Sequence, residues 1–190
     1  LNTLNHPAKV EAFVNTLEFN FEEKGETLKS PVMVLRTRSA HCIEGAILAA
    51  YILSLHGYPP LLMHLKTTRD DYDHVVTLFQ KRGLWGAISK TNHSILRYRE
   101  PIYRDIRELA VSYFNEYFLD NGKKTLRSYS EPLNLDIFVN SWPKEESNLW
   151  GIDEELDEIK HFPIAPKKTL ANLRKVDKVK IKAGKLTGKD

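Results

Sequence analysis

Hydrophobic residues recur at helical spacing in two segments of the chain, residues 7–23 and residues 101–118. Residues 7–23 repeat apolar side chains every three or four positions, which predicts an amphipathic helix over Pro7–Glu23. The same spacing over Pro101–Phe118 predicts a second amphipathic helix, with Pro101 at its first position and the turn Asp120-Asn121-Gly122 after its end. The aromatic residues of this second helix are expected in the core.

A third helix is predicted between these two. It is expected to run from Ser39, as N-cap, to about His56, because Gly57-Tyr58-Pro59-Pro60 cannot continue it. Small residues such as Gly45 and Ala49 would let it approach a sheet closely. Three strand-like runs follow, Leu61–Thr68, Asp73–Gln80 and Leu84–Ser89, and they predict an antiparallel meander. The expected fold class is therefore α+β, with a central cysteine-bearing helix packed on the meander and further helices on its flanks.

The remaining segments carry weaker patterns. Ser30–Arg36 is predicted to be a short entry strand or strap. Residues 126–150 are predicted to form an irregular strap across the domain, because Phe138, Trp142, Leu149 and Trp150 would not be left wholly in water. A short acidic helix is expected over Gly151–Lys160. We expect residues 1–166 to form a single domain and residues 167–190 to form a basic, flexible tail.

Charge is distributed unevenly along the chain. The sequence holds 28 Lys and Arg and 25 Asp and Glu, a net charge of +3, whereas residues 167–190 alone carry +7 and leave −4 for the rest. A mildly acidic body argues against a nucleic-acid-binding face, so nucleic acid or an acidic partner is expected, if at all, at the tail.

Location is also constrained by the sequence. No apolar run approaches the roughly 18 residues of a membrane span, and Leu1–Phe21 lacks the features of a signal peptide, so we expect a cytoplasmic protein without a membrane partner. Because the sequence begins with Leu1 and not with a methionine, an upstream targeting segment stays open. A single cysteine excludes an intrachain disulfide, which agrees with a reducing compartment.

The lone cysteine, Cys42, is the main candidate for chemistry. Counted from a Ser39 cap it stands at the third helical position, where unpaired backbone N–H groups and the helix dipole favour a thiolate. The alternative is a small buried hydrophobe. A thiol nucleophile needs a nearby base, and His74 is the best candidate because it opens the second strand of the meander. His41, next to the cysteine, leaves the helix at a different angle, and the other histidines lie mid-strand, at ends or in loops.

The run Cys42–Pro60, followed by His74–Phe79 and Leu84–Ile88, resembles the cysteine, histidine and following strand of the transglutaminase-like superfamily, which has a papain-like fold. The resemblance covers Ser39 to Asn92. It implies a catalytic triad with Cys42 as nucleophile and His74 as base. In that superfamily a tryptophan in the following strand, here Trp85, precedes an aspartate by about four residues. The corresponding position here is Ser89.

Two residues compete for the third place in the triad. A three-residue loop Lys81-Arg82-Gly83 would put Asn92 on the face of His74, whereas a two-residue loop Arg82-Gly83 would put Ser89 and Thr91 there. Asn92 is the preferred prediction, because a side-chain amide can accept from the imidazole N–H, and Ser89 is the alternative. The oxyanion site would use the Cys42 backbone N–H and one further donor that the sequence does not identify.

The sequence therefore predicts cysteine-dependent acyl transfer, or hydrolysis of a peptide, amide or ester, through a thioacyl intermediate. The alternative is a catalytically inactive binding or scaffold module on the same fold. Neither a cofactor nor a metal is expected, because Asp70, Asp71 and Asp73 are not accompanied by a calcium-loop spacing. The substrate, the choice between hydrolase and transferase, and the oligomeric state are left open.

Overall fold

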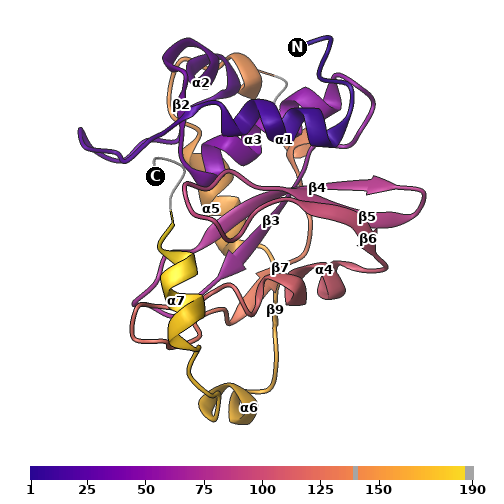
Figure 1. Cartoon of the computed structure of the whole chain (residues 1–190). Helices are drawn as coiled ribbons and strands as arrows, with labels where there is room; N and C mark the ends of the chain where they lie inside the picture. The colour runs from indigo at the N-terminus through magenta and orange to yellow at the C-terminus, as the bar shows by residue number, and fades with distance from the viewer. Residues whose placement is uncertain (139–140, 187–190) are drawn as a thin grey trace.

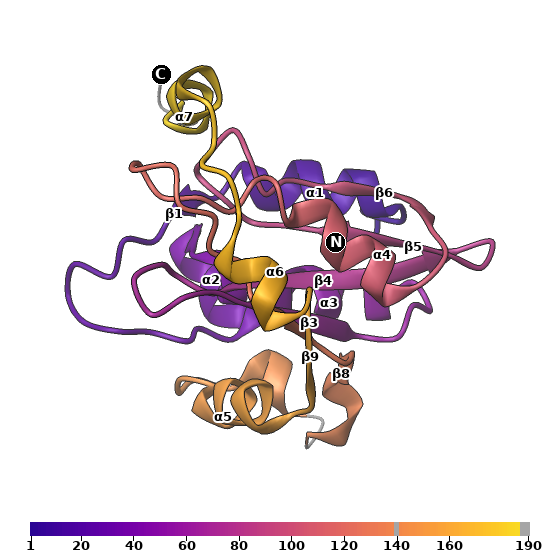
Figure 2. The same cartoon turned by 90° about the horizontal axis from the view of Figure 1, so that it is seen from below.

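The computed structural model describes residues 1–138 and 141–186. Within these ranges the chain is α+β, with helices on both faces of a largely antiparallel sheet (Figures 1 and 2). The sheet has the strand order β6-β5-β4-β3-β7-β9, with β8 also paired to β3. Its strands are β3 (Leu61–Lys66), β4 (His74–Lys81), β5 (Leu84–Ile88), β6 (Arg99–Tyr103), β7 (Ser128–Ser130), β8 (Leu133–Asn134) and β9 (His161–Pro163).

The predicted meander is confirmed as β3, β4 and β5. Lys81 pairs with Leu84, so the loop between β4 and β5 has two residues, Arg82 and Gly83. Both adopt left-handed backbone angles, with φ of 53° and 79°. Two-residue hairpin loops of type I′ need this conformation at both positions, and their twist matches that of the flanking strands. The two-residue alternative is therefore the register that forms.

Helix α3 (Cys42–Ser54) is the predicted central helix, and it packs on β4. It begins at Cys42 and not just after Ser39, since Ser39 and Ala40 form the short strand β2. This strand pairs in parallel with β1 (Glu18–Phe19). A Cβ atom on Gly45 would lie 2.4 Å from Cβ of Lys90, so the glycine allows the close approach of helix and sheet that the small residues predicted.

Two predictions near the N-terminus are corrected. Helix α1 (Pro7–Asn15) is shorter than the predicted Pro7–Glu23, because the Thr16 hydroxyl donates to the carbonyl oxygen of Phe13 at 2.7 Å and the chain turns there. The segment predicted to be an extended strap is helix α2 (Pro31–Thr37). Ser30 caps it by accepting a hydrogen bond from the Met33 backbone, and Pro31 occupies the first turn, where a proline is tolerated.

The helix predicted over Pro101–Phe118 starts later and ends earlier. Pro101 lies in β6, at the edge of the sheet, where a missing backbone N–H does not interrupt the pairing. Helix α4 (Ile106–Tyr113) begins after Asp105, whose carboxylate accepts from the Glu108 backbone at 2.8 Å. Its apolar face covers the side of the sheet opposite to α3 (Figure 1).

The C-terminal third of the chain forms the side of the sheet opposite to β6. Residues predicted to be irregular contain β7, β8 and the short 3₁₀ helices η1 (Leu135–Ile137) and η2 (Trp142–Lys144). The predicted acidic helix is α5 (Trp150–Glu158), which packs on α3 through Ile152 and Leu156. Helices α6 (Lys167–Ala171) and α7 (Lys178–Gly184) lie within the predicted tail, whose residues 187–190 are outside the described ranges. None of the helices in the described part of the chain has the length and apolar character needed to cross a membrane.

Substituting Gly45→Ala should destabilise the protein by about 1–3 kcal/mol, because the added methyl group overlaps Lys90 and forces α3 away from the sheet. The denaturant midpoint of unfolding measures this. Gly151→Ala in α5 is the matched control, since a Cβ there meets nothing within 4 Å. An equal effect of the two substitutions would contradict the packing argument.

Candidate active site

Cys42 is the first residue of α3, and its side chain is partly buried. Helix N-terminal N–H groups have no intrahelical partners and lie at the positive end of the helix dipole. The thiol is therefore two positions closer to the helix start than predicted, with His41 as the N-cap in place of Ser39. The first-turn location on which the nucleophile hypothesis depends is retained.

A buried carboxylate, that of Glu44, fixes the start of α3. One oxygen accepts from the His41 backbone N–H at 3.1 Å, and the other accepts from the Lys29 backbone N–H at 2.9 Å and from the Thr27 hydroxyl at 2.7 Å. The ammonium of Lys29 lies 3.5 Å from the same carboxylate and also donates to Oγ of Ser39 at 2.9 Å. Because these buried charges are hydrogen-bonded, the chain before the thiol is held relative to the helix.

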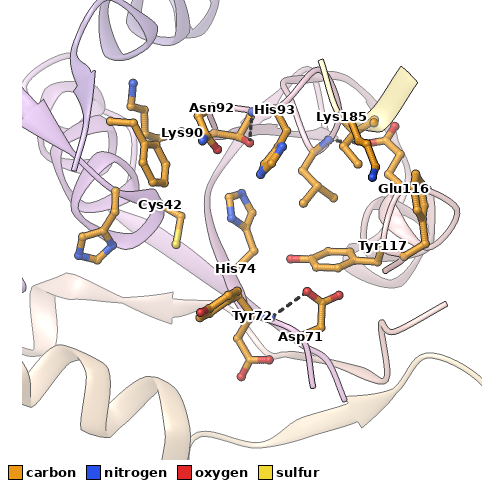
Figure 3. Close-up of a pocket in the computed structure, with 18 of the residues that line it drawn as sticks. Cys42, Asp71, Tyr72, His74, Lys90, Asn92, His93, Glu116, Tyr117 and Lys185 are labelled. Carbon is orange, nitrogen blue, oxygen red and sulfur yellow. Dashed lines mark hydrogen bonds between the residues drawn. The ribbon is translucent and has the colours of Figure 1, made fainter. Parts of the chain in front are cut away.

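His74 is buried at the start of β4, and its orientation is set by Ser89. Nε2 of His74 lies 2.7 Å from Oγ of Ser89, and this hydroxyl donates its own proton to the carbonyl oxygen of Leu96. The hydroxyl can then only accept from the imidazole, so Nε2 carries the hydrogen and Nδ1 keeps its lone pair. Figure 3 shows the His74 imidazole and the Cys42 sulfur beside the same space. Nδ1 is thus the nitrogen that can take or return a proton in the pocket.

The two candidates for the third residue are now distinguished by position. The two-residue hairpin loop puts Ser89 on the same face as His74, and the Ser89 backbone N–H is held by Oε2 of Glu11 at 3.0 Å. Asn92 lines the same pocket, but within the described residues its side chain makes no hydrogen bond to the imidazole. The geometry gives the orienting contact to Ser89, and the three-residue loop that favoured Asn92 does not form.

His41 is a functional candidate that sequence reasoning missed. Its imidazole interacts with the Cys42 sulfur, while Nε2 lies 2.9 Å from the carbonyl oxygen of Thr27 and 3.5 Å from carboxylate oxygens of Glu22 and Glu44. Burial lowers the pKa of His41, but the interactions with Cys42 and Glu44 outweigh burial and raise the pKa to about 9. The sequence signal for this role is His41 directly before Cys42, with Glu44 three residues after His41, as in a capping box.

These contacts decide the charge of the thiol. Burial alone would raise the pKa of Cys42, but the imidazoles of His41 and His74 outweigh burial and lower the pKa to about 5. At neutral pH the sulfur is therefore a thiolate. A thiolate, and not a thiol, is the form of cysteine that acts as a nucleophile.

A cavity of about 620 Å³ opens beside Cys42 and His74. Its walls come from residues 19–22, the start of α3, the turn at 71–74, residues 90–96 and residues 116–120. Helix α7 supplies a further wall through Ile181, Gly184 and Lys185. The cavity therefore collects residues from both ends of the chain around the thiolate.

Helix α7 is attached to this cavity by specific contacts. The Ser94 hydroxyl donates to the carbonyl oxygen of Ala183 at 2.6 Å, and Nζ of Lys185 lies 2.8 Å from Oδ2 of Asp120. Gly184 packs so closely on the Phe118 ring that a Cβ there would lie 2.9 Å from it. The described part of the predicted tail thus contributes to the site, while its flexibility and the domain limit at residue 166 stay predictions.

Asp70, Asp71 and Asp73 lie in the turn between β3 and β4. Each has a partner: Nζ of Lys123 lies 2.8 Å from Asp70, the Thr125 hydroxyl donates to Asp71 at 2.5 Å, and Nε2 of His64 lies 3.3 Å from Asp73. Among the described residues no group of three or more His, Cys, Asp or Glu side chains could hold a metal ion.

No protein-family model matches the chain, and no curated protein matches it at a significant level. Among solved structures, the chain is similar to Legionella pneumophila LapG (EGTA-treated), with 14% sequence identity and a TM-score of 0.41. The similarity covers 76% of this chain and 77% of that chain.

The rate of Cys42 alkylation by iodoacetamide should rise through a midpoint near pH 5, because the thiolate is lost only as the pH falls through the pKa of about 5. His41→Gln and His74→Ala should each move the midpoint upward by about one unit or more, since each removes a group that stabilises the thiolate. His56→Ala, beyond the far end of α3, is the control. A wild-type midpoint near the ordinary value of about 8.5, unaffected by either substitution, would contradict the assignment.

Ser89→Ala should also raise the alkylation midpoint, because His74 loses the acceptor that fixes its Nε2–H. We expect a loss of stability of about 1–3 kcal/mol as well, since two buried polar groups lose a partner. Asn92→Ala is the comparison and should leave the midpoint unchanged. The reverse order of effects would restore Asn92 as the orienting residue.

Proposed function

We propose that this protein is a cysteine-dependent acyl-transfer enzyme that acts on an amide or ester carbonyl. The observation that carries the proposal is the position of the Cys42 sulfur at the start of α3, where it interacts with the imidazoles of His41 and His74. A nucleophile, a base and a residue that orients the base are the parts such chemistry needs. The order of cysteine helix, histidine strand and following strand supports a transglutaminase-like, papain-like assignment as part of the same proposal.

In the first half-reaction the sulfur attacks the carbonyl carbon, and the π electrons of the C=O bond move to the oxygen. The tetrahedral intermediate then expels the leaving group, which takes from Nδ1 of His74 the proton that the Cys42 thiol gave up when the thiolate formed. The products are a thioacyl enzyme and the free amine or alcohol. In the second half-reaction water or an amine attacks the thioacyl carbon, gives its proton to Nδ1 of His74 and releases the thiolate.

The two histidines have different roles in this scheme. His41 faces Glu22 and Glu44 and supplies a fixed positive charge beside the sulfur. His74 faces the pocket with one nitrogen and Ser89 with the other, so it is the residue that transfers protons. This division lets one imidazole hold the thiolate while the other changes protonation state.

The second candidate function is an inactive binding module on the same fold. The observation that favours it is the hydroxyl of Ser89 at the third position, because a hydroxyl accepts from the imidazole but stabilises an imidazolium less than a carboxylate does. Such a module would keep a cavity and a reactive thiolate without turnover. Acylation therefore separates the two candidates, whereas alkylation does not.

Incubation with p-nitrophenyl acetate should add one acetyl group to Cys42, detected by intact-protein mass spectrometry, with a burst of p-nitrophenolate and slower turnover. Cys42→Ala should abolish the adduct, and His74→Ala should slow acylation by about 10²- to 10⁴-fold. His56→Ala should acylate at the wild-type rate. A wild-type protein that reacts with iodoacetamide near pH 5 but forms no acetyl adduct would support the binding module instead.

A further inference from the structure

The hydroxyl of Tyr117 is a buried polar group without a partner. Tyr117 is only 3% exposed, and its hydroxyl makes no hydrogen bond to any described protein atom. A buried donor left unpaired is costly, so native structures rarely keep one without a reason. Of the buried side-chain atoms in residues 1–138 and 141–186 that have no partner, only this one belongs to a residue lining the cavity.

The hydroxyl points at the reacting groups. Figure 3 shows the Tyr117 ring entering the cavity from the side opposite to Cys42, with its hydroxyl directed toward His74. After burial, the charge of Cys42 is the largest influence on the pKa of Tyr117 and raises it, which places the phenol within the field of the thiolate. Because burial acts in the same direction, the phenol keeps its proton and is available as a donor.

The Tyr117 ring is held in place by packing and by backbone contacts of its chain segment. It packs in the apolar cluster beneath the sheet that includes Val76 and Leu126. The Tyr117 carbonyl oxygen accepts from the Thr125 backbone N–H at 3.2 Å, and the next residue, Phe118, forms an isolated bridge with Lys124. These contacts to both ring and backbone fix the position from which the hydroxyl can donate.

We propose that Tyr117 is a catalytic residue whose hydroxyl donates a hydrogen bond to the carbonyl oxygen of the acyl group that Cys42 attacks. This inference rests on the proposed function and supplies the second donor, beside the Cys42 backbone N–H, that the sequence left unidentified. As the carbon–sulfur bond forms, negative charge develops on the carbonyl oxygen, and the hydrogen bond strengthens without transfer of the phenolic proton. The donor that is unpaired in the free protein thus gains its partner in the intermediate.

The test compares two reactions of the same sulfur. Acylation by p-nitrophenyl acetate develops an oxyanion, whereas alkylation by iodoacetamide is a displacement at a saturated carbon and develops none. Tyr117→Phe should therefore lower the acylation rate constant by about 10²-fold and leave the alkylation rate and its pH midpoint unchanged.

Tyr113→Phe is the matched control. Tyr113 lies one turn earlier in the same cluster, but its hydroxyl donates to the carbonyl oxygen of Arg97 at 3.4 Å and it does not line the cavity. This variant should acylate at the wild-type rate. Removal of the unpaired Tyr117 hydroxyl should leave the thermal unfolding midpoint unchanged or raise it, since no hydrogen bond within the protein is lost.

Three outcomes would overturn the inference. Equal acylation by wild type and Tyr117→Phe would show that the hydroxyl does not touch the acyl oxygen. An equal fall in acylation and alkylation would show that Tyr117 only supports the position of the thiolate. If the wild type alkylates near pH 5 but does not acylate, the proposed function fails, and this inference fails with it.

Discussion

Glu44 puts a carboxylate with no exposed surface one turn into α3, and a charge in that position must be compensated from several directions. Four residues from three chain segments meet this requirement: Asn20 after β1, Thr27 and Lys29 before α2, and the His41 backbone before α3. The carboxylate therefore fixes the loops that border the cavity as well as the start of the helix that carries the thiol. Removing it would leave the buried ammonium of Lys29 uncompensated, so fold and site depend on the same group.

The Glu44 carboxylate also acts on the Cys42 sulfur, because it lies beside the His41 imidazole. In a cysteine triad a third residue normally acts on the histidine that transfers protons, and in the proposed mechanism the neutral hydroxyl of Ser89 takes that position. The negative charge lies instead on the opposite side of the sulfur, where Glu44 and Glu22 face the His41 imidazole. The thiolate is then stabilised by a histidine that need not change its protonation state. Ser89 only has to select the tautomer of His74, which a hydroxyl anchored on a carbonyl oxygen can do.

The parts of this site that the sequence predicts are those with local signals. Cys42 and His74 follow from a helix start and a strand start, and Gly45 from small-residue spacing. Ser89 depends on whether the β4–β5 loop holds two or three residues, and one residue of register exchanges the two faces of a strand. The pattern at Pro101 predicts a helix start, but Pro101 lies in β6, at the edge of the sheet. The sequence of a strand does not show which strands lie beside it. Helical spacing places the Tyr117 ring in the core correctly, but spacing carries no information about where a hydroxyl at the far end of that ring emerges.

The lining of the cavity bears on what can bind beside the thiolate. Every carboxylate that lines it in the described part of the chain has a hydrogen-bond or ion-pair partner: Glu22 with Thr27, Asp71 with Thr125, Asp73 with His64, Glu116 with Arg99 and Asp120 with Lys185. A cationic substrate would have to compete with those partners for its counter-charge. A neutral acyl group faces no such competition, because it can pack on Phe19, Ile95 and Phe118, and the proposed hydrogen bond to its carbonyl oxygen uses the one buried cavity-lining side-chain donor that these described residues leave unpaired. The cavity is therefore suited to recognising a neutral acyl group by shape and hydrogen bonding, and its charged groups serve the nucleophile.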